Sequence, residues 1–391
     1  MAPSDWTSLP SDLVRRVADV FLASCDVDYY MNLRTVCRNW RAATDDPRGP
    51  DPRFSPRRWV LVQSLTGEFG RSRCLFLHVD TGRLLWKDVP MLCNYTCVAS
   101  AEDGHLILEP ASRNSRICLL NPITGRVVFF PVTAAQFLGD NEFGLGQGRR
   151  MFAASSSPMV LYRFFDSSSG GCIDPTWDAV FNRESLFRTT STLGMFASML
   201  PFKGRAYAVN NNGSVVMVVE HNCRLDEKPE LTTVVTSGSN GMQSCRAFLV
   251  DNAGEMLLVR LLLSEVQVFR VDVENGALLQ IKSIGNRAIF LGGQHCLSVD
   301  ASNLPTIECN SIYYIGAGLY GGIYMHCLNG GSHMKFPSSF LRKVDIDAES
   351  PKSLARVLMD YACHDKCDVG CITVSDLRNL CVTTSVPYSI I

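Results

Sequence analysis

Turn signals that contain glycine recur along most of this 391-residue chain at a nearly constant interval. Each lies beside a short run rich in β-branched and aromatic residues, and glycine supplies the positive φ that tight hairpin turns require. The intervals are 22 residues (Gly82 to Gly104), 21 residues (Gly104 to Gly125), 41 residues (Gly213 to Gly254) and 22 residues (Gly254 to Gly276), with no clear interval over residues 137–192. The pattern predicts a long series of β-hairpins.

Two such hairpins fit one four-stranded propeller blade, which takes about 40–45 residues. We therefore predict a mainly all-β domain over residues 58–337, most simply a β-propeller of about six blades. An ordinary β-sandwich or barrel has turns every 8–12 residues or so and could produce the same interval, so the turns alone leave that alternative open.

The first fifty residues have helical periodicity instead. Pro10 suits the first turn of a helix, and the apolar residues Leu13, Val17 and Phe21 follow at spacings of four. Asp28 is a candidate N-cap for a second helix, which Pro47 would end. The apolar positions of that second helix are three and four residues apart or adjacent: Leu33, Val36, Cys37 and Trp40.

Two or three short helices in about 45 residues cannot bury a sufficient core by themselves. The apolar stripe must therefore pack either on the large domain or on a partner chain, and the residues alone do not choose between these. The Pro- and Gly-rich residues 47–57 indicate a linker, and we expect the basic cluster Arg53, Arg57 and Arg58 to be solvated there.

Composition excludes several classes of function. Hydrophobic residues make up 46% and charged residues 19%, which is typical of a folded globular protein. The net charge of −1 gives no basic excess, so we expect no nucleic-acid partner. No apolar stretch reaches the roughly 18 residues that a bilayer-spanning helix needs, so no membrane partner is expected either.

The sixteen cysteines are scattered through apolar stretches, and the N-terminal residues do not resemble a secretory signal. Reduced, buried thiols in the cytoplasm or nucleus are therefore the expected state.

The C-terminal region, residues 338–391, contains one predicted helix over residues 350–362, which starts near Pro351. The cluster Cys363, His364, Cys367 and Cys371 is the most metal-like group in the chain. It lacks the second ligand pair of a usual zinc site, and its spacing of four also fits core-facing cysteines on a helix. We predict no metal, no cofactor and no catalytic residue.

The N-terminal residues resemble the F-box family, whose pattern is Leu-Pro, a spaced Leu and Ile/Val, and a closing Val-Cys-x-x-Trp-Arg. Residues 9–14 read LPSDLV, Val17 follows, and residues 33–41 read LRTVCRNWR. The resemblance implies a three-helix module, residues 1–46, that docks on the Skp-type adaptor of a cullin-RING ubiquitin ligase. It assigns adaptor binding to Leu9, Pro10, Leu13, Val17, Val36, Cys37 and Trp40.

The large domain resembles plant F-box proteins with a KIB-type β-propeller. The matching blocks are residues 202–209 followed by Gly213, residues 248–260, residues 268–272, residues 284–292, and residues 310–314. An Asn-Pro-x-Thr-Gly turn at residues 121–125 matches as well.

Together these resemblances imply a non-catalytic subunit of a Skp–cullin–F-box ligase: the F-box would bind the Skp-type adaptor and, through it, cullin. The propeller would bind a target protein through loops that the sequence does not identify. The alternative is a propeller-based ligand sensor, scaffold or enzyme with a vestigial F-box.

Overall fold

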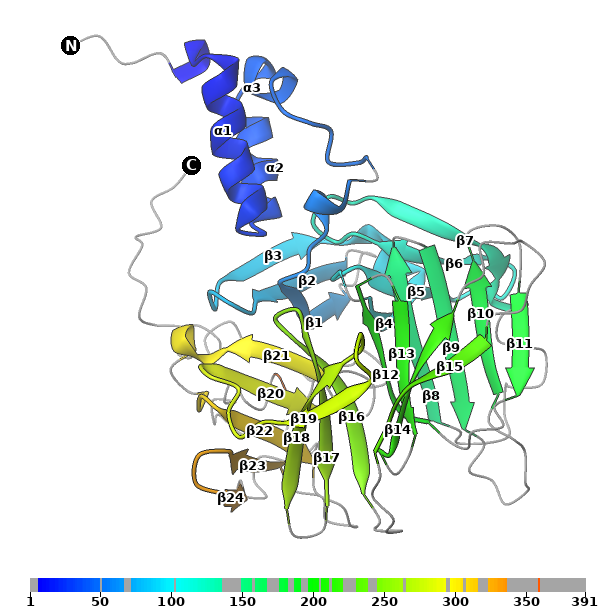
Figure 1. Ribbon diagram of the computed structural model, residues 1–391. Coiled ribbons are helices and arrows are strands. Elements are labelled where there is room, and N and C mark those ends of the chain that lie inside the picture. Colours follow the sequence, from blue (N-terminus) through cyan, green and yellow to red (C-terminus); the bar gives the residue numbers. More distant parts are fainter. Residues whose placement is uncertain are drawn as a thin grey trace, which may run out of the picture.

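The computed structural model of the chain begins with a small group of helices and continues as a ring of β-sheets (Figure 1). It describes residues 6–335 and residue 358, apart from gaps at residues 50, 67–71, 102, 136–148, 157–158, 167–175, 182–185, 191–195, 204, 211–212, 221–229, 238–244, 263–264, 293–295, 305–306 and 316–322. In this part of the chain no helix is long and apolar enough to cross a membrane.

The helices are α1 (Ser11–Ala23), α2 (Val27–Thr35) and α3 (Arg38–Ala42), accompanied by short 3-10 turns: η1 (Trp6–Ser8), η2 (Pro52–Phe54), η3 (Pro90–Cys93) and η4 (Ala301–Asn303). Pro10 immediately precedes α1.

Two details of the predicted second helix were wrong. Asp28 is not its N-cap, because Cys25 adopts a positive φ of 58° and α2 already begins at Val27. The helix also does not continue to Trp40. Cys37 is extended (φ −158°, ψ 171°) and starts α3, where its sulfur accepts a hydrogen bond from the Trp40 backbone N–H at 3.4 Å.

The strands form six sheets in the described part of the chain, almost all of them simple antiparallel meanders. The first sheet has three strands and the next four sheets have four each; the last has five in the order β21-β20-β22-β23-β24, with β20 and β22 parallel. The strand bounds are β1 (Trp59–Thr66), β2 (Ser72–His78), β3 (Leu84–Asp88), β4 (Tyr95–Ser100), β5 (Leu106–Pro110), β6 (Arg116–Leu120), β7 (Val127–Thr133), β8 (Arg149–Ser156), β9 (Met159–Asp166), β10 (Thr176–Phe181), β11 (Leu186–Thr190), β12 (Phe196–Phe202), β13 (Arg205–Asn210), β14 (Val215–Glu220), β15 (Glu230–Thr236), β16 (Arg246–Asn252), β17 (Glu255–Leu261), β18 (Val266–Asp272), β19 (Ala277–Gln280), β20 (Arg287–Leu291), β21 (Cys296–Asp300), β22 (Ser311–Ile315), β23 (Ile323–Cys327) and β24 (Ser332–Lys335).

This architecture confirms a mainly β propeller and refines its blade count. Five sheets have the four or more strands of a complete blade, whereas β1–β3 has only three, so the prediction of about six blades was slightly too high. The turn signals were placed correctly: all six glycines of the regular interval have a positive φ, between 63° and 91°.

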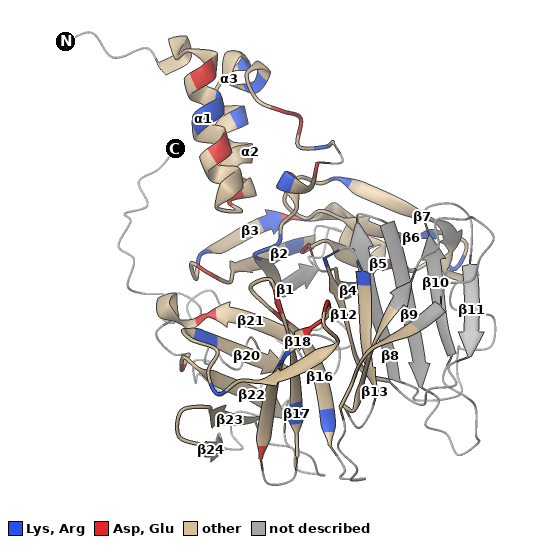
Figure 2. Ribbon diagram, in the orientation of Figure 1, with Lys and Arg blue, Asp and Glu red and all other residues tan. Residues whose placement is uncertain are grey.

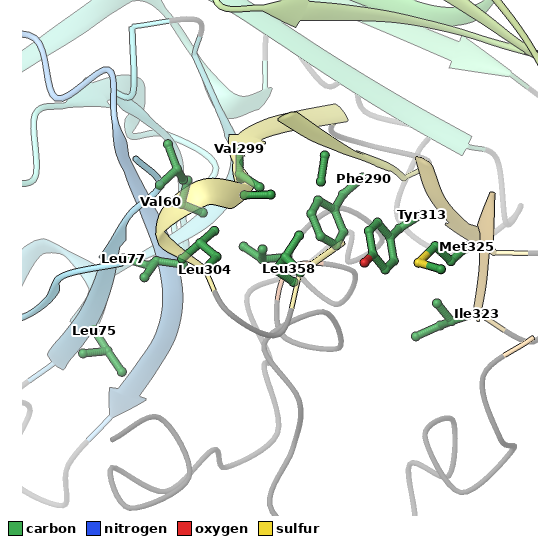
Figure 3. Packing of buried hydrophobic residues seen from close by; sticks show 14 residues of the cluster. Val60, Leu75, Leu77, Phe290, Val299, Leu304, Tyr313, Ile323, Met325 and Leu358 are labelled. Carbon is green, nitrogen blue, oxygen red and sulfur yellow. The ribbon is translucent and has the colours of Figure 1, made fainter. Parts of the chain in front are cut away.

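The ring closes by side-chain packing. The edge strands β4, β8, β12, β16 and β21 contact one another in succession and so line the inside of the ring. No strand ladder joins β1–β3 to another sheet among the described strands. Instead, a cluster of buried apolar side chains fills the space between the first and last sheets, as Figure 3 shows for Val60, Leu77, Phe290, Tyr313 and the fully buried Leu358.

The segment before β1 is packed in part: Arg53 and Arg57 are exposed, as expected of a solvated linker, but the residues between them are not. Residues 54–56 are buried, and Gly104 approaches Pro56 so closely that an added Cβ would lie 2.1 Å from the Pro56 carbonyl oxygen. The guanidinium of Arg53 pairs with Asp45 at 2.8 Å and with Asp51 at 2.6 Å, and Arg58 pairs with Asp80 at 3.0 Å. Asp45 precedes the segment in the chain and Asp80 follows it, so the two arginines connect it to both sides. The domain boundaries at 46 and 58 stay predictions.

Leu358 belongs to the C-terminal region yet lies inside the cluster that joins the first and last sheets. We expect Leu358→Ala to lower the free energy of unfolding by about 2–5 kcal/mol, because truncating a buried leucine leaves a cavity. The exposed Leu279 of β19, 51% accessible, is the matched control. Urea unfolding measures both, and equal effects of Leu358→Ala and Leu279→Ala would contradict the packing of Leu358.

His78, at the end of β2, makes the stability depend on pH. Its side chain is buried edge-on against Trp59, and neither ring nitrogen has a hydrogen-bond partner. Burial lowers the pKa of His78, although Asp26, 4.0 Å away, acts in the opposite direction. Burial also lowers the pKa of His326. The unfolded chain therefore binds more protons than the folded chain once the pH falls below the ordinary histidine pKa of about 6.5, and stability decreases there.

We expect His78→Phe, which keeps an aromatic ring against Trp59, to reduce the loss of stability between pH 7.5 and 5.5. Part of the loss should remain because of His326. Urea midpoints of the variant and the unmodified protein at the two pH values give the comparison. A variant that loses as much stability on acidification as the unmodified protein would exclude His78 as a source of this pH dependence.

Candidate functional site

Helix α1 has two apolar faces, of which only one is covered. Val14, Ala18 and Leu22 are at most 8% exposed, whereas Leu13, Val17 and Val20 are 40%, 44% and 65% exposed. At 3.6 residues per turn, positions 13, 17 and 20 fall on one side of the helix. We call these three side chains the apolar face of α1. Neighbouring apolar side chains left in water are a common sign of a protein-binding surface.

The covered face belongs to a small core inside the helical module. Val14, Ala18 and Leu22 pack with Tyr30 and Leu33 of α2, with Ala43, and with Phe54 of the following segment. Tyr30 lies 5.2 Å from the Phe54 ring, centroid to centroid, and its hydroxyl donates to the Asp45 carbonyl at 2.8 Å. Burial raises the pKa of Tyr30. The module thus has its own core, and that core does not use the apolar face of α1.

Cationic side chains satisfy the carbonyl groups at the end of α3. Arg15 donates to the Ala43 carbonyl at 2.9 Å, and Arg34 donates to the carbonyls of Thr44 and Asp45 at 2.8 and 2.5 Å. Positive charge is favourable at a helix C-terminus, where carbonyls lack helical partners. These bonds tie α1 and α2 to the end of α3.

The structure separates the seven residues assigned to adaptor binding into two groups. Pro10, Leu13, Val17 and Val36 are exposed, with Val36 54% accessible between α2 and α3. Leu9 and Trp40 pack against the module's own core, and half-buried Cys37 caps α3. Contact with an adaptor stays a prediction for all seven.

Two exposed residues were missing from that assignment. Val20 extends the apolar face of α1. It follows Leu13 by seven residues, which is two helical turns, and this spacing could have identified it from the sequence. Trp6 is 67% exposed, and its carbonyl accepts a hydrogen bond from the Trp40 indole N–H at 3.2 Å. No periodic pattern precedes Trp6, so only the fold places it beside α3. Charged side chains of both signs occur on α1 as well (Figure 2).

The propeller carries polar side chains that bond one another across sheets. Arg287 donates to the Ser298 hydroxyl at 2.8 Å, and that hydroxyl donates to Asn252 of the neighbouring sheet at 2.6 Å. Asn303 donates to the Asp80 carbonyl at 2.6 Å and so links the last sheet to the first. These hydrogen bonds are structural links.

Metal ligation finds no support in the part of the chain that the structure describes, where no three His, Cys, Asp or Glu side chains are grouped to hold an ion. The cluster of Cys363, His364, Cys367 and Cys371 lies outside the described residues, as does the predicted helix over residues 350–362 except for Leu358.

Comparison with known proteins agrees with this architecture. Two relatives from Arabidopsis thaliana are named F-box proteins: SKIP23 is 23% identical over 80% of this chain and 84% of its own length, and At2g26160 is 21% identical over 81% of this chain and 96% of its own length. A luciferin-regenerating enzyme aligns over 72% of this chain and 88% of its own with a TM-score of 0.33 and 7% identity, which is too weak to support any inference. The KIB1-4 beta-propeller family model matches residues 76–333, well over half of the sequence. The chain therefore belongs to the KIB1-4 beta-propeller family.

Proposed function

We propose that this protein is the substrate-recognition subunit of a Skp–cullin–F-box ubiquitin ligase. The apolar face of α1 carries the proposal, because three apolar side chains face water on a module whose core is complete without them. A Skp-type adaptor would cover this face and connect the protein to cullin. The names of the Arabidopsis relatives, which share most of the chain, support the assignment of the module as an F-box.

The propeller binds the target protein in this proposal, and the chain itself performs no chemistry. Holding a target lysine near a conjugating enzyme raises its effective concentration, which accelerates transfer without any catalytic residue in the receptor. The near-neutral net charge of −1 supports a protein partner over nucleic acid. The free cysteines, among them buried Cys118, support a reducing compartment, the cytoplasm or nucleus.

Leu13→Lys and Val17→Lys should each abolish binding of a Skp-type adaptor. Each substitution places a charge where the adaptor would otherwise desolvate an apolar side chain, and an unpaired buried charge is strongly unfavourable. Both positions are exposed in the free protein, so circular dichroism should show an unchanged fold. Co-purification with a recombinant Skp-type adaptor, followed by calorimetry, measures the loss.

The matched control is Asp19→Lys, which adds the same side chain to α1 away from its apolar face. Asp19 has a 68% exposed side chain, and its 3.8 Å pair with Arg53 is of a kind that contributes little to stability. We expect Asp19→Lys to bind the adaptor normally. Adaptor binding by both Leu13→Lys and Val17→Lys at the affinity of the unmodified protein would refute the assignment of this face.

A second prediction separates a ligase receptor from a scaffold that binds the adaptor but directs no ubiquitin transfer. Proteins that bind the propeller should accumulate in plant cells that express Leu13→Lys, because their bound state no longer leads to degradation. In cells that express the unmodified chain, the same proteins should accumulate only when the proteasome is inhibited. Proximity labelling with the two chains makes the comparison, and identical levels of every labelled protein in both would favour the scaffold.

A further inference from the structure

The helical module is attached to the propeller by its second helix, not by the linker alone. Val27, the first residue of α2, is fully buried in a cluster that comes mainly from the first two sheets and includes Phe76 and Leu106. On the linker side, the Asn121 amide donates to the Phe54 carbonyl at 2.8 Å, although the Phe54 ring packs inside the helical module. The two domains therefore share apolar and polar contacts along their junction, which Figure 1 shows beside β2 and β3.

A single arginine of the propeller holds the start of α2. Arg83, in the turn between β2 and β3, contacts Asp26 at 2.5 Å and both carboxylate oxygens of Asp28 at 2.5 and 2.8 Å. Its guanidinium also lies 3.9 Å from the ring centre of Tyr29 and 4.9 Å from that of Trp59. Three parts of the junction thus meet one planar cation: the residue before α2, the first turn of α2, and the start of β1.

This group is shielded from water. Asp28 is only 6% exposed, and the side chains of Arg83 and Asp26 are 21% and 18% exposed. A bidentate arginine–carboxylate pair fixes both distance and angle, because two parallel N–H donors must align with two oxygens. Apolar burial, such as that of Val27, is non-directional and does not select one angle. The ionic group is therefore the part of the junction that can set an orientation.

We propose that Arg83 is a positioning residue that fixes the direction of the α1 apolar face relative to the propeller. The proposal rests on the function proposed above, in which the adaptor binds one domain and the target binds the other. A target lysine benefits from proximity only if the two domains keep a defined arrangement, since effective concentration falls when a connection is loose. Arg83 touches none of the residues of the apolar face, so its role is separable from adaptor binding.

The test measures the distance between the two domains in the full chain. Fluorophores are introduced through non-canonical amino acids at exposed Ala42 of α3 and exposed Glu274 near β19, because sixteen native cysteines prevent thiol labelling. Single-molecule energy transfer then gives the distribution of distances. We expect a single narrow distribution for the unmodified protein, and a broader, shifted one for Arg83→Asp, which places a third carboxylate beside Asp26 and Asp28.

A charge exchange distinguishes orientation from general stability. In the double variant Asp28→Arg with Arg83→Asp, the new arginine can pair with Asp26 and with the carboxylate introduced at position 83, and we expect the narrow distribution to return. Should Arg83→Asp fail to fold, Arg83→Lys takes its place: it keeps the charge, loses the bidentate geometry, and should broaden the distribution by a smaller amount. An unchanged distribution in the single variant, or a double variant as broad as Arg83→Asp, would overturn the proposal.

Adaptor binding is measured in the same variants and should be unchanged in each. If the unmodified protein fails to bind any Skp-type adaptor, the proposed function fails, while the distance distributions still decide whether Arg83 sets the orientation. If adaptor binding is normal and the distributions are unaffected by Arg83→Asp, only the positioning role is lost.

Discussion

Packing between neighbouring sheets is the constraint on which the rest of this structure depends. Where the structure describes their side chains, the sheets have apolar residues on both faces, so successive residues of one strand pack against different neighbouring sheets. In β2, Leu75 and Leu77 pack toward the last sheet, whereas Cys74 and Phe76 pack toward the second. In β16, Phe248 and Val250 face one neighbour, and Ala247 and Leu249 face the other. Sheets buried on both faces are expected to have such continuous hydrophobic runs. A sheet at the end of an open row would leave one whole face in water, so the row has to close into a ring.

The first sheet both closes the ring and supports the helical module. It meets the last sheet through apolar contacts and the link from Asn303 to Asp80, and it meets the second sheet through its other face. The same sheet supports the helical module, since Arg83 follows β2 and Trp59 begins β1. A change in how the first and last sheets pack would therefore also move the strands that contact α2. Closure of the ring and the orientation of the F-box module depend on the same three strands.

Local chemistry made much of the fold predictable from sequence. A glycine with positive φ is required by its own turn, so the regular interval located the hairpins without knowledge of their partners. Features that depend on distant residues were not predictable. The break at Cys37 separates apolar positions that look continuous in sequence, and the packing of residues 54–56 depends on Gly104. Nor could periodicity distinguish Val14 from Val17, both apolar on α1, because the difference lies in what covers them. The family pattern selected Leu13 and Val17 as contact residues but also included Leu9 and Trp40, which pack inside the module.

The two longer helices of the module make different contacts, and the proposed function requires this difference. Helix α1 uses one side for the module's core and leaves Leu13, Val17 and Val20 in water, where the propeller does not reach them. Helix α2 places Val27 and Asp28 against the propeller. A single apolar surface could not have served both purposes, because covering it with the propeller would remove it from any partner. Since the junction uses α2 and its preceding turn, the apolar face of α1 can be occupied without disturbing how the propeller is held.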